Sequence, residues 1–142
     1  EQGICLSSNC FEQMNALKKF NEDRIYKNKR LLPFQRYAEL VLTELFNTLF
    51  ALYDGKHTWD SLENAKGEYP LFVGSFERWL ARYCEVSIVP AGELQALALS
   101  CENEKIYRSL ESKAVFVQAV LDFISGMTDR FAIKSYQDLL TF

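Results

Sequence analysis

Apolar residues recur at intervals of three and four along most of this chain, which is the spacing of amphipathic α-helices. Three prolines divide the sequence into blocks that carry this pattern. Ser7, Ser8 or Asn9 can cap the first helix, and Pro33 suits the first turn of the second. The second block is apolar over a wide face, so we expect its helix to lie in the centre of the core. The pattern predicts five long helices, from about Asn9 to Asn28, from Pro33 to about Tyr53, from Leu71 to Cys84, from Glu102 to Ser125, and from Thr128 or Asp129 to Leu140.

Shorter segments connect these helices. The stretch of residues 56–69 has mixed polarity and is predicted to hold a short helix that begins behind Thr58 or Ser61. The segment from Val86 to Gly92 is rich in β-branched residues but contains a proline, so it is predicted to be an extended connector. Residues Glu93 to Leu99 are predicted to form one or two helical turns. The sequence therefore predicts an all-α fold, a single bundle-like domain of five to six helices.

Composition and charge are those of an ordinary globular protein. Apolar residues make up 49% of the 142 residues and charged residues 25%, which fits one soluble domain with a sizeable core. The net charge of −3 argues against a dedicated nucleic-acid surface. Basic clusters at Lys18 and Lys19 and at residues 27–30 lie near Glu22 and Asp23, so we interpret them as solvated helix faces.

The sequence also indicates a cytoplasmic location. No apolar run approaches the length of a transmembrane helix, and the first ten residues lack the apolar region of a signal peptide. Cys5 and Cys10 are too far apart for a C-x-x-C redox pair, and no His/Cys cluster completes a zinc site. We expect reduced thiols, because a Cys5–Cys10 disulfide would require an oxidising compartment.

The most specific pattern in the chain is LDFISGMTDRFAIKSY, from Leu121 to Tyr136. It resembles the closing segment of the bacterial deoxyguanosine triphosphate triphosphohydrolases, the dGTPase branch of the HD-domain nucleotidases, whose pattern is D-[YF]-I-[AS]-G-M-T-D-x-[YF]-A. A second segment, LKKFNEDRIYKNKRL from Leu17 to Leu31, resembles the L-K-x-F-x-x-x-x-[IL]-Y segment that follows the catalytic core in that family. The matching residues of the first segment are Asp122, Phe123, Ile124, Ser125, Gly126, Met127, Thr128, Asp129, Phe131 and Ala132.

The chain lacks the residues of an HD metal site. Such a site needs a His, a His-Asp pair and a later Asp, because a divalent ion requires several fixed nitrogen and oxygen donors. The one histidine, His57, is followed by Thr58. The resemblance therefore implies that residues 1–142 form a single all-α C-terminal domain of a larger dGTPase-like protein. We expect the chain alone to hold no cofactor and to be inactive.

The resemblance also implies what the parent protein does. The parent would hydrolyse a deoxynucleoside triphosphate, with dGTP expected, to the deoxynucleoside and tripolyphosphate, using Mg²⁺ or Mn²⁺ in its HD core. The portion present here would help to close the nucleotide pocket, form subunit contacts, or both. Its expected partners are that HD core and further copies of itself in a homo-oligomer, with no membrane. The alternative is a free-standing helical interaction module with no catalytic role.

We interpret the segment Gly126 to Arg130 as a helix–helix corner. A glycine tolerates the positive φ at which many helices end, Met127 fills an irregular gap, and Thr128 or Asp129 caps the next helix. Asp129 also favours a helix N-terminus electrostatically. Asp129 and Arg130 are at the same time candidate substrate contacts of the complete enzyme.

Three further positions carry open alternatives. Asp122 lies among apolar neighbours, so if it is buried we expect an ion pair with Arg130 or Lys134. Arg24 is a candidate to bind a phosphate, and Tyr26 is a candidate to stack on a base. In the alternative, Tyr26 packs on the second helix and Arg24 is solvated.

The predicted helix from Glu102 should carry i,i+3 and i,i+4 ion pairs. The acids expected in these pairs are Glu102, Glu104 and Glu111, beside Lys105, Arg108 and Lys113.

Overall fold

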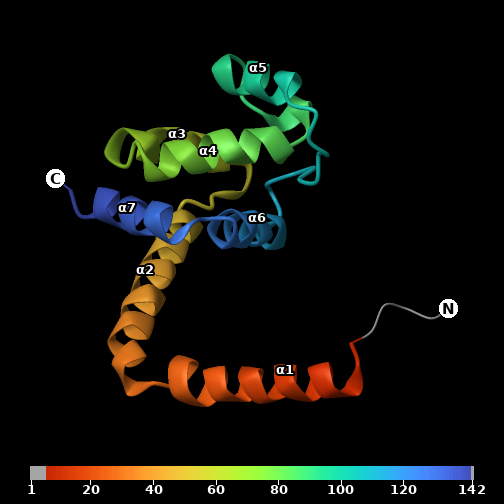
Figure 1. The fold of residues 1–142 in the computed structure, drawn as a ribbon. Helices are drawn as coiled ribbons and strands as arrows, with labels where there is room; N and C mark the ends of the chain where they lie inside the picture. Colours follow the sequence, from red (N-terminus) through yellow and green to blue (C-terminus); the bar gives the residue numbers. More distant parts are fainter. Residues whose placement is uncertain (1–5, 142) are drawn as a thin grey trace. The chain divides into compact units, whose positions relative to one another are not determined.

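A computed structural model of the chain describes residues 6–141. Helices account for 76% of the structure, with no strand among the described residues, so the all-α class is confirmed. Seven α-helices occur within residues 6–141, compared with the five to six predicted (Figure 1). They are α1 (Ser8–Asn21), α2 (Leu32–Ala51), α3 (Thr58–Glu68), α4 (Phe72–Tyr83), α5 (Glu93–Ser100), α6 (Lys113–Ser125) and α7 (Asp129–Leu139).

The chain divides into two compact units, with the boundary between Glu39 and Leu40 inside α2. The first unit holds α1, two short helical turns and the start of α2. The second unit holds the remainder of α2 and all later helices, and it contains the buried core. None of the helices in the described part of the chain is long and apolar enough to cross a bilayer.

The first unit follows the predicted pattern of caps. The Ser7 Oγ accepts a hydrogen bond from the Cys10 amide at 3.4 Å, so Ser7 is the N-cap of α1 among the candidates at positions 7–9. Helical structure continues through a π-helical turn, η1 (Glu22–Tyr26), and a 3-10 turn, η2 (Lys29–Leu31). Pro33 lies in the first turn of α2, where its missing N–H costs nothing. The possible Cys5–Cys10 disulfide lies outside the described residues.

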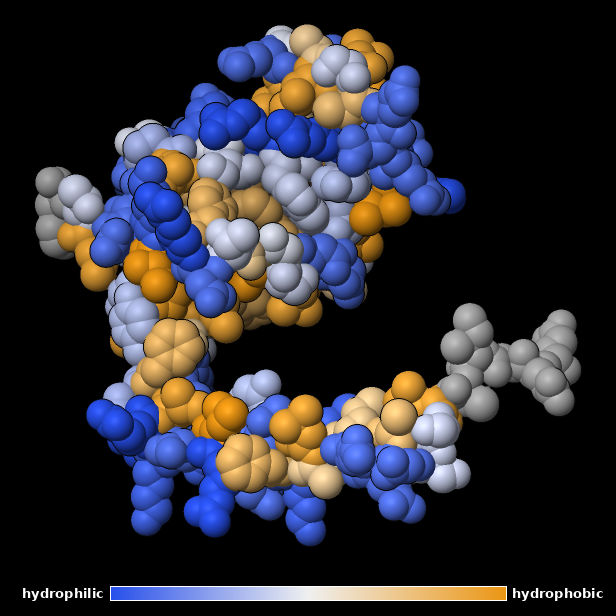
Figure 2. All heavy atoms as spheres, in the orientation of Figure 1, coloured by the Kyte–Doolittle hydropathy of each residue, from blue (hydrophilic) through white to orange (hydrophobic). Residues whose placement is uncertain are grey.

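No residue of α1 is buried. The large apolar side chains of this helix are more than half exposed, with Phe11 at 53%, Leu17 at 60% and Phe20 at 58%. Figure 2 shows hydrophobic side chains on the surface of α1, beside hydrophilic ones. The α1 helix therefore presents an apolar surface that nothing in its own unit covers.

The core of the second unit is built around α4. Five of its side chains, Phe72, Val73, Phe76, Leu80 and Ala81, are completely buried. The Phe76 ring meets aromatic rings of α6 at centroid distances of 6.0 Å (Phe116, edge-on) and 5.2 Å (Phe123). The central helix is thus α4, and not α2 as its wide apolar face had suggested. Three residues of α2 are buried, all in the half that belongs to the second unit: Val41, Leu45 and Leu49.

The helix predicted to begin at Glu102 begins instead at Lys113. The preceding segment is held in a non-helical conformation by a backbone bridge, in which the Tyr107 amide donates to the Tyr83 carbonyl and the Glu85 amide donates to the Tyr107 carbonyl, each at 3.1 Å. Burial of Tyr107, which is 3% exposed, offsets the helical hydrogen bonds that this segment forgoes.

The predicted ion pairs along this segment were therefore wrong. Within residues 6–141, Glu102, Glu104 and Glu111 take part in no salt bridge. Lys105 instead donates from Nζ to the Arg82 carbonyl at 2.8 Å and to the Ala98 carbonyl at 2.9 Å. These carbonyls lie in the last turns of α4 and α5, where a cation is favourable.

Charged side chains also hold α4 at two other places. On its buried side, Glu77 is 1% exposed and accepts a hydrogen bond from Lys66 of α3 at 3.0 Å. Burial raises the pKa of the Glu77 carboxyl, and the Lys66 ammonium opposes this shift. At the N-terminus, Asp138 of α7 accepts from the Leu71 amide at 3.1 Å and from the Phe72 amide at 3.0 Å. A residue distant in sequence thus caps α4.

Replacing Asp138 with Ala should destabilise the chain by about 1–2 kcal/mol, because two amides at the start of α4 lose their acceptor. Urea unfolding followed by far-ultraviolet circular dichroism measures this. Glu104→Ala, which removes a carboxylate from an exposed and non-helical position, is the control and should change stability by less than about 0.5 kcal/mol. Equal effects of the two substitutions would contradict the capping role.

Candidate functional site

The corner between α6 and α7 forms as predicted at Thr128 and differs from the prediction at Gly126. The Thr128 Oγ1 accepts a hydrogen bond from the Phe131 amide at 3.3 Å, so Thr128 is the N-cap of α7 and Asp129 is its first residue. Gly126 has φ −82° and ψ −3°, an ordinary right-handed conformation. The expected positive φ at Gly126 was therefore wrong. Among the described residues, positive φ occurs at Gly55 and Gly92.

The Gly126 position leaves room for a side chain. A Cβ atom there would lie 3.4 Å from the Asp122 carbonyl oxygen and 3.6 Å from that of Phe123, which are ordinary contact distances. The chain changes direction between α6 and α7 at Met127 and Thr128, which are not helical. The Met127 side chain packs against the core at this point. Thr128, with φ −77° and ψ 153°, then begins the new helix.

An apolar groove of about 560 Å³ runs beside this corner, within the second unit. We call it the corner groove. Two leucines on its walls, Leu42 and Leu121, are 44% and 48% exposed, so apolar surface is open to solvent there. The groove is lined by Leu42, Thr43 and Phe46 of α2, by Leu121, Ile124 and Ser125 of α6, and by Met127, Thr128, Asp129 and Ala132.

Asp122 binds a tyrosine and an amide, and not a cation. The Tyr107 hydroxyl donates to Asp122 Oδ2 and the Gln118 amide donates to Oδ1, both at 2.7 Å. The predicted pairing with Arg130 or Lys134 was wrong, because no salt bridge of Asp122 occurs in the described part of the chain. Burial, together with the hydrogen bond to Asp122, raises the pKa of Tyr107, so this tyrosine remains a donor at neutral pH.

The candidate substrate contacts are all exposed. Asp129 and Arg130 lie in the first turn of α7, in the second unit. Arg24 and Tyr26 lie in η1, in the first unit. The alternative, in which Tyr26 packs on the second helix, would bury its ring, but the residue is 65% exposed. A role of these four residues in nucleotide binding stays a prediction.

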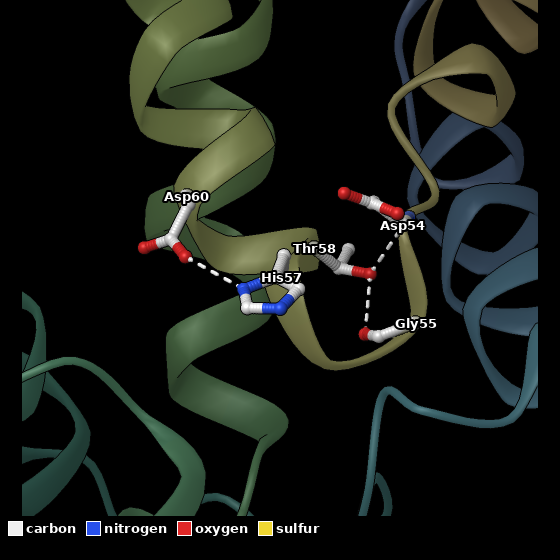
Figure 3. Close-up of polar contacts among 5 residues, drawn as sticks. All are labelled: Asp54, Gly55, His57, Thr58 and Asp60. Carbon is white, nitrogen blue, oxygen red and sulfur yellow. Dashed lines mark hydrogen bonds and ion pairs between the residues drawn. The ribbon is translucent and has the colours of Figure 1, made fainter.

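His57 is a surface residue. Its Nδ1 lies 3.4 Å from Asp60 Oδ2, and the two side chains are 74% and 78% exposed (Figure 3). The neighbouring Thr58 hydroxyl donates to the Gly55 carbonyl at 2.8 Å and accepts from the Asp54 amide at 3.1 Å, which fixes the turn before α3 (Figure 3). In residues 6–141 no three His, Cys, Asp or Glu side chains gather in a way that could hold a metal ion.

Sequence reasoning missed the partners of the site. The contact between Tyr107 and Asp122 spans 15 positions and crosses from a non-helical segment to a helix, so helical periodicity gives no signal for it. The corner groove depends on α2 and α6 lying close together, which is likewise not a local property. An Asp inside an apolar stripe was the available signal that some partner existed.

Comparison with known proteins gives one family match, and it covers the corner between α6 and α7. The family model of a phosphohydrolase-associated domain matches residues 98–138. This range contains Tyr107, Asp122, the corner and one wall of the corner groove. No curated protein and no solved structure matches the chain. The matched segment fits the context of an HD-domain phosphohydrolase.

Thr128→Ala should cost about 0.5–2 kcal/mol, because the cap of α7 is lost. Gly126→Ala should change stability by less than about 0.5 kcal/mol, because its conformation is right-handed and its Cβ has space. Thermal unfolding of both variants measures the difference. A large loss of stability in Gly126→Ala would show that the corner needs glycine for a reason other than its backbone angles.

Tyr107→Phe should cost about 1–3 kcal/mol, because it removes a hydrogen bond to a half-buried carboxylate. A tyrosine pKa that is raised by folding stabilises the native state below the unfolded pKa of about 10, and this stabilisation is lost as pH rises above it. The wild-type chain should therefore lose stability in alkali more steeply than Tyr107→Phe. Tyr26→Phe, at an exposed ring, is the matched control and should behave as wild type. Identical alkaline profiles of all three proteins would contradict the assignment.

Proposed function

We propose that this chain is the C-terminal portion of a metal-dependent deoxynucleoside triphosphate triphosphohydrolase, and that its corner groove packs against the HD core of that enzyme. The observation that carries the proposal is the match of residues 98–138 to a phosphohydrolase-associated domain, since these residues supply one wall of the groove. The resemblance of Leu121 to Tyr136 to the dGTPase closing segment supports dGTP as the substrate.

The energetics of the groove favour a protein neighbour. Each apolar side chain that becomes fully buried contributes about 1.5–3 kcal/mol relative to exposure. Leu42 and Leu121 are each about half exposed and face the same groove, so covering them would supply part of an interface. A helix or loop of the catalytic core that fills this groove would be positioned next to Asp129 and Arg130.

The catalytic groups belong to the core in this proposal. A divalent ion, Mg²⁺ or Mn²⁺, held by that core would supply the activated water for attack on the α-phosphorus. The residues of this chain would position the nucleotide. In the second unit, the exposed Arg130 suits a phosphate, because a guanidinium group can bind two phosphate oxygens. In the first unit, considered by itself, Arg24 suits a phosphate and the exposed ring of Tyr26 suits a base. A cytoplasmic homo-oligomer is part of the same proposal.

The test uses the protein encoded by the open reading frame that contains this chain, assayed for release of tripolyphosphate from each deoxynucleoside triphosphate with Mg²⁺ or Mn²⁺. We expect activity with dGTP, and none from residues 1–142 alone. Leu42→Asp and Leu121→Asp should lower activity by about 10- to 100-fold, because a displaced module misplaces the nucleotide.

Leu99→Asp is the matched control, because this leucine is 69% exposed and lies outside the groove. It should leave activity unchanged. Absence of tripolyphosphate release from every nucleotide would sink the proposed reaction, and full activity of both groove variants would sink the proposed packing. In the first case a free-standing interaction module is the better reading of the open groove.

A further inference from the structure

A second cavity of the second unit lies between α3, α4 and the start of α5. Its volume is about 420 Å³, within the range of cavities that hold small molecules. It shares no lining residue with the corner groove. Charged side chains form most of its wall, so we call it the polar cavity. These charged residues are Asp60, Glu63, Lys66, Glu77, Arg78 and Glu93.

One lysine lies at the centre of this charged wall. Lys66 Nζ donates to Glu63 Oε2 of its own helix and to Glu77 Oε2 of α4. The aliphatic part of Lys66 lies against Gly74 of α4, where an added Cβ atom would be 3.4 Å from Lys66 Cγ. The glycine lets the lysine lie close to α4, and the two carboxylates hold its ammonium group. The wall of the polar cavity is therefore fixed by its own contacts.

The carboxylates of this wall are not fully compensated. Within residues 6–141, Lys66 is the one cation that pairs with Glu63 and Glu77, and it binds one oxygen of each. Glu77 is 1% exposed, so bulk water contributes little to its second oxygen. Burial raises the pKa of the Glu77 carboxyl, and Lys66 opposes this shift without cancelling it. With every carboxyl ionised, four carboxylates and two cations give the cavity a net charge of −2.

Two hydrogen-bond donors of the polar cavity also lack an acceptor. Trp59 Nε1–H is buried and donates to no atom of the described residues. A buried indole N–H ordinarily has a partner, so this one indicates a ligand that carries an acceptor. Arg78 is exposed and forms no salt bridge within residues 6–141, so its guanidinium group is available to a carboxylate.

We propose that the polar cavity binds a basic amino acid, with its ammonium groups on the carboxylates of the cavity and its α-carboxylate on Trp59 Nε1 and Arg78. An ammonium group supplies the further cation that the buried Glu77 lacks, and a carboxylate supplies the acceptor that the indole lacks. The negative net charge of the cavity favours a ligand that is positive overall. This inference does not rest on the proposed hydrolase function.

Two simpler occupants of the cavity suit it less well. A water molecule can accept from Trp59, but it leaves the net charge of −2 in place. A metal ion needs several close ligands, and in the described part of the chain no three His, Cys, Asp or Glu side chains gather for one. A metal ion also offers no acceptor to the indole N–H. A ligand that carries both signs of charge satisfies the donors and the carboxylates together.

The experiment titrates the whole chain, residues 1–142, with L-lysine and follows the indole N–H signals of its two tryptophans by ¹H–¹⁵N NMR. We expect the Trp59 signal to shift and to saturate below about 10 mM lysine. The signal of Trp79, which does not line the cavity, should stay in place. L-Norleucine, which lacks the side-chain ammonium group, and cadaverine, which lacks the carboxylate, should each bind at least about tenfold more weakly.

Calorimetry then compares the affinity of variants for L-lysine. Glu77→Gln should weaken binding at least about tenfold, because an amide does not pair with an ammonium group. Trp59→Phe removes the N–H donor and should weaken binding about 3- to 10-fold. Glu93→Gln, at an exposed position of the cavity, should weaken it about 2- to 5-fold. Glu104→Gln removes an exposed carboxylate outside the cavity and is the matched control, which should bind as wild type.

Three results would overturn the proposal. They are no shift of the Trp59 signal with L-lysine, binding of L-norleucine and cadaverine as tight as that of L-lysine, and equal weakening by Glu104→Gln and by the cavity variants. Circular dichroism establishes that each variant is folded, and Trp59→Phe and Glu93→Gln carry the test if Glu77→Gln does not fold. Failure here leaves the hydrolase test untouched, because that test measures nucleotide cleavage by a longer protein.

Discussion

The second unit depends on the way both ends of α4 are held by charged side chains from elsewhere in the chain. Asp138 binds two amides at the start of α4, and Lys105 binds a carbonyl in its last turn. The two amides at the start of α4 are partly buried, whereas the Arg82 carbonyl at its end is exposed. Without Asp138, each of these amides would cost about 1–3 kcal/mol. Through these hydrogen bonds, α7 is attached to the start of α4 and the segment before α6 is attached to its end.

Features that depend on neighbours in sequence could be predicted, and features that depend on distant neighbours could not. The cap at Thr128, the cap at Ser7 and the first-turn position of Pro33 each involve residues within a few positions of one another, and all three are present. Tyr107 shows the limit. Its apolar neighbours and helical spacing predicted a helix, but its backbone pairs with Tyr83 and Glu85 and its hydroxyl binds Asp122. Tertiary contacts outweighed local propensity there.

The candidate site shows the same division. The run from Asp122 to Asp129 was recognisable from sequence, and the structure gives it a shape: one wall of an apolar groove beside a capped helix start. The reason for glycine at position 126 was mistaken, because its backbone is right-handed. The opposite wall comes from α2, so no local pattern around the motif could have placed Leu42 or Phe46 in it. Likewise, the net charge of −3 is the sum of a charge of +2 in residues 1–39 and a charge of −5 in residues 40–142, so it describes neither unit.

Each of the two units leaves apolar surface uncovered, and this bears on what kind of molecule the chain is. An isolated helix of about 12–15 residues is marginal in water, and most helical stability in proteins comes from packing of an apolar face. The α1 helix has 14 residues and none is buried, so its own unit supplies no such packing. The second unit has a complete core but leaves half-exposed leucines along the corner groove. Both surfaces are open within their own units, which agrees with our proposal that this chain packs against a further protein domain. The match of residues 98–138 to a phosphohydrolase-associated domain fits the context of an HD-domain phosphohydrolase.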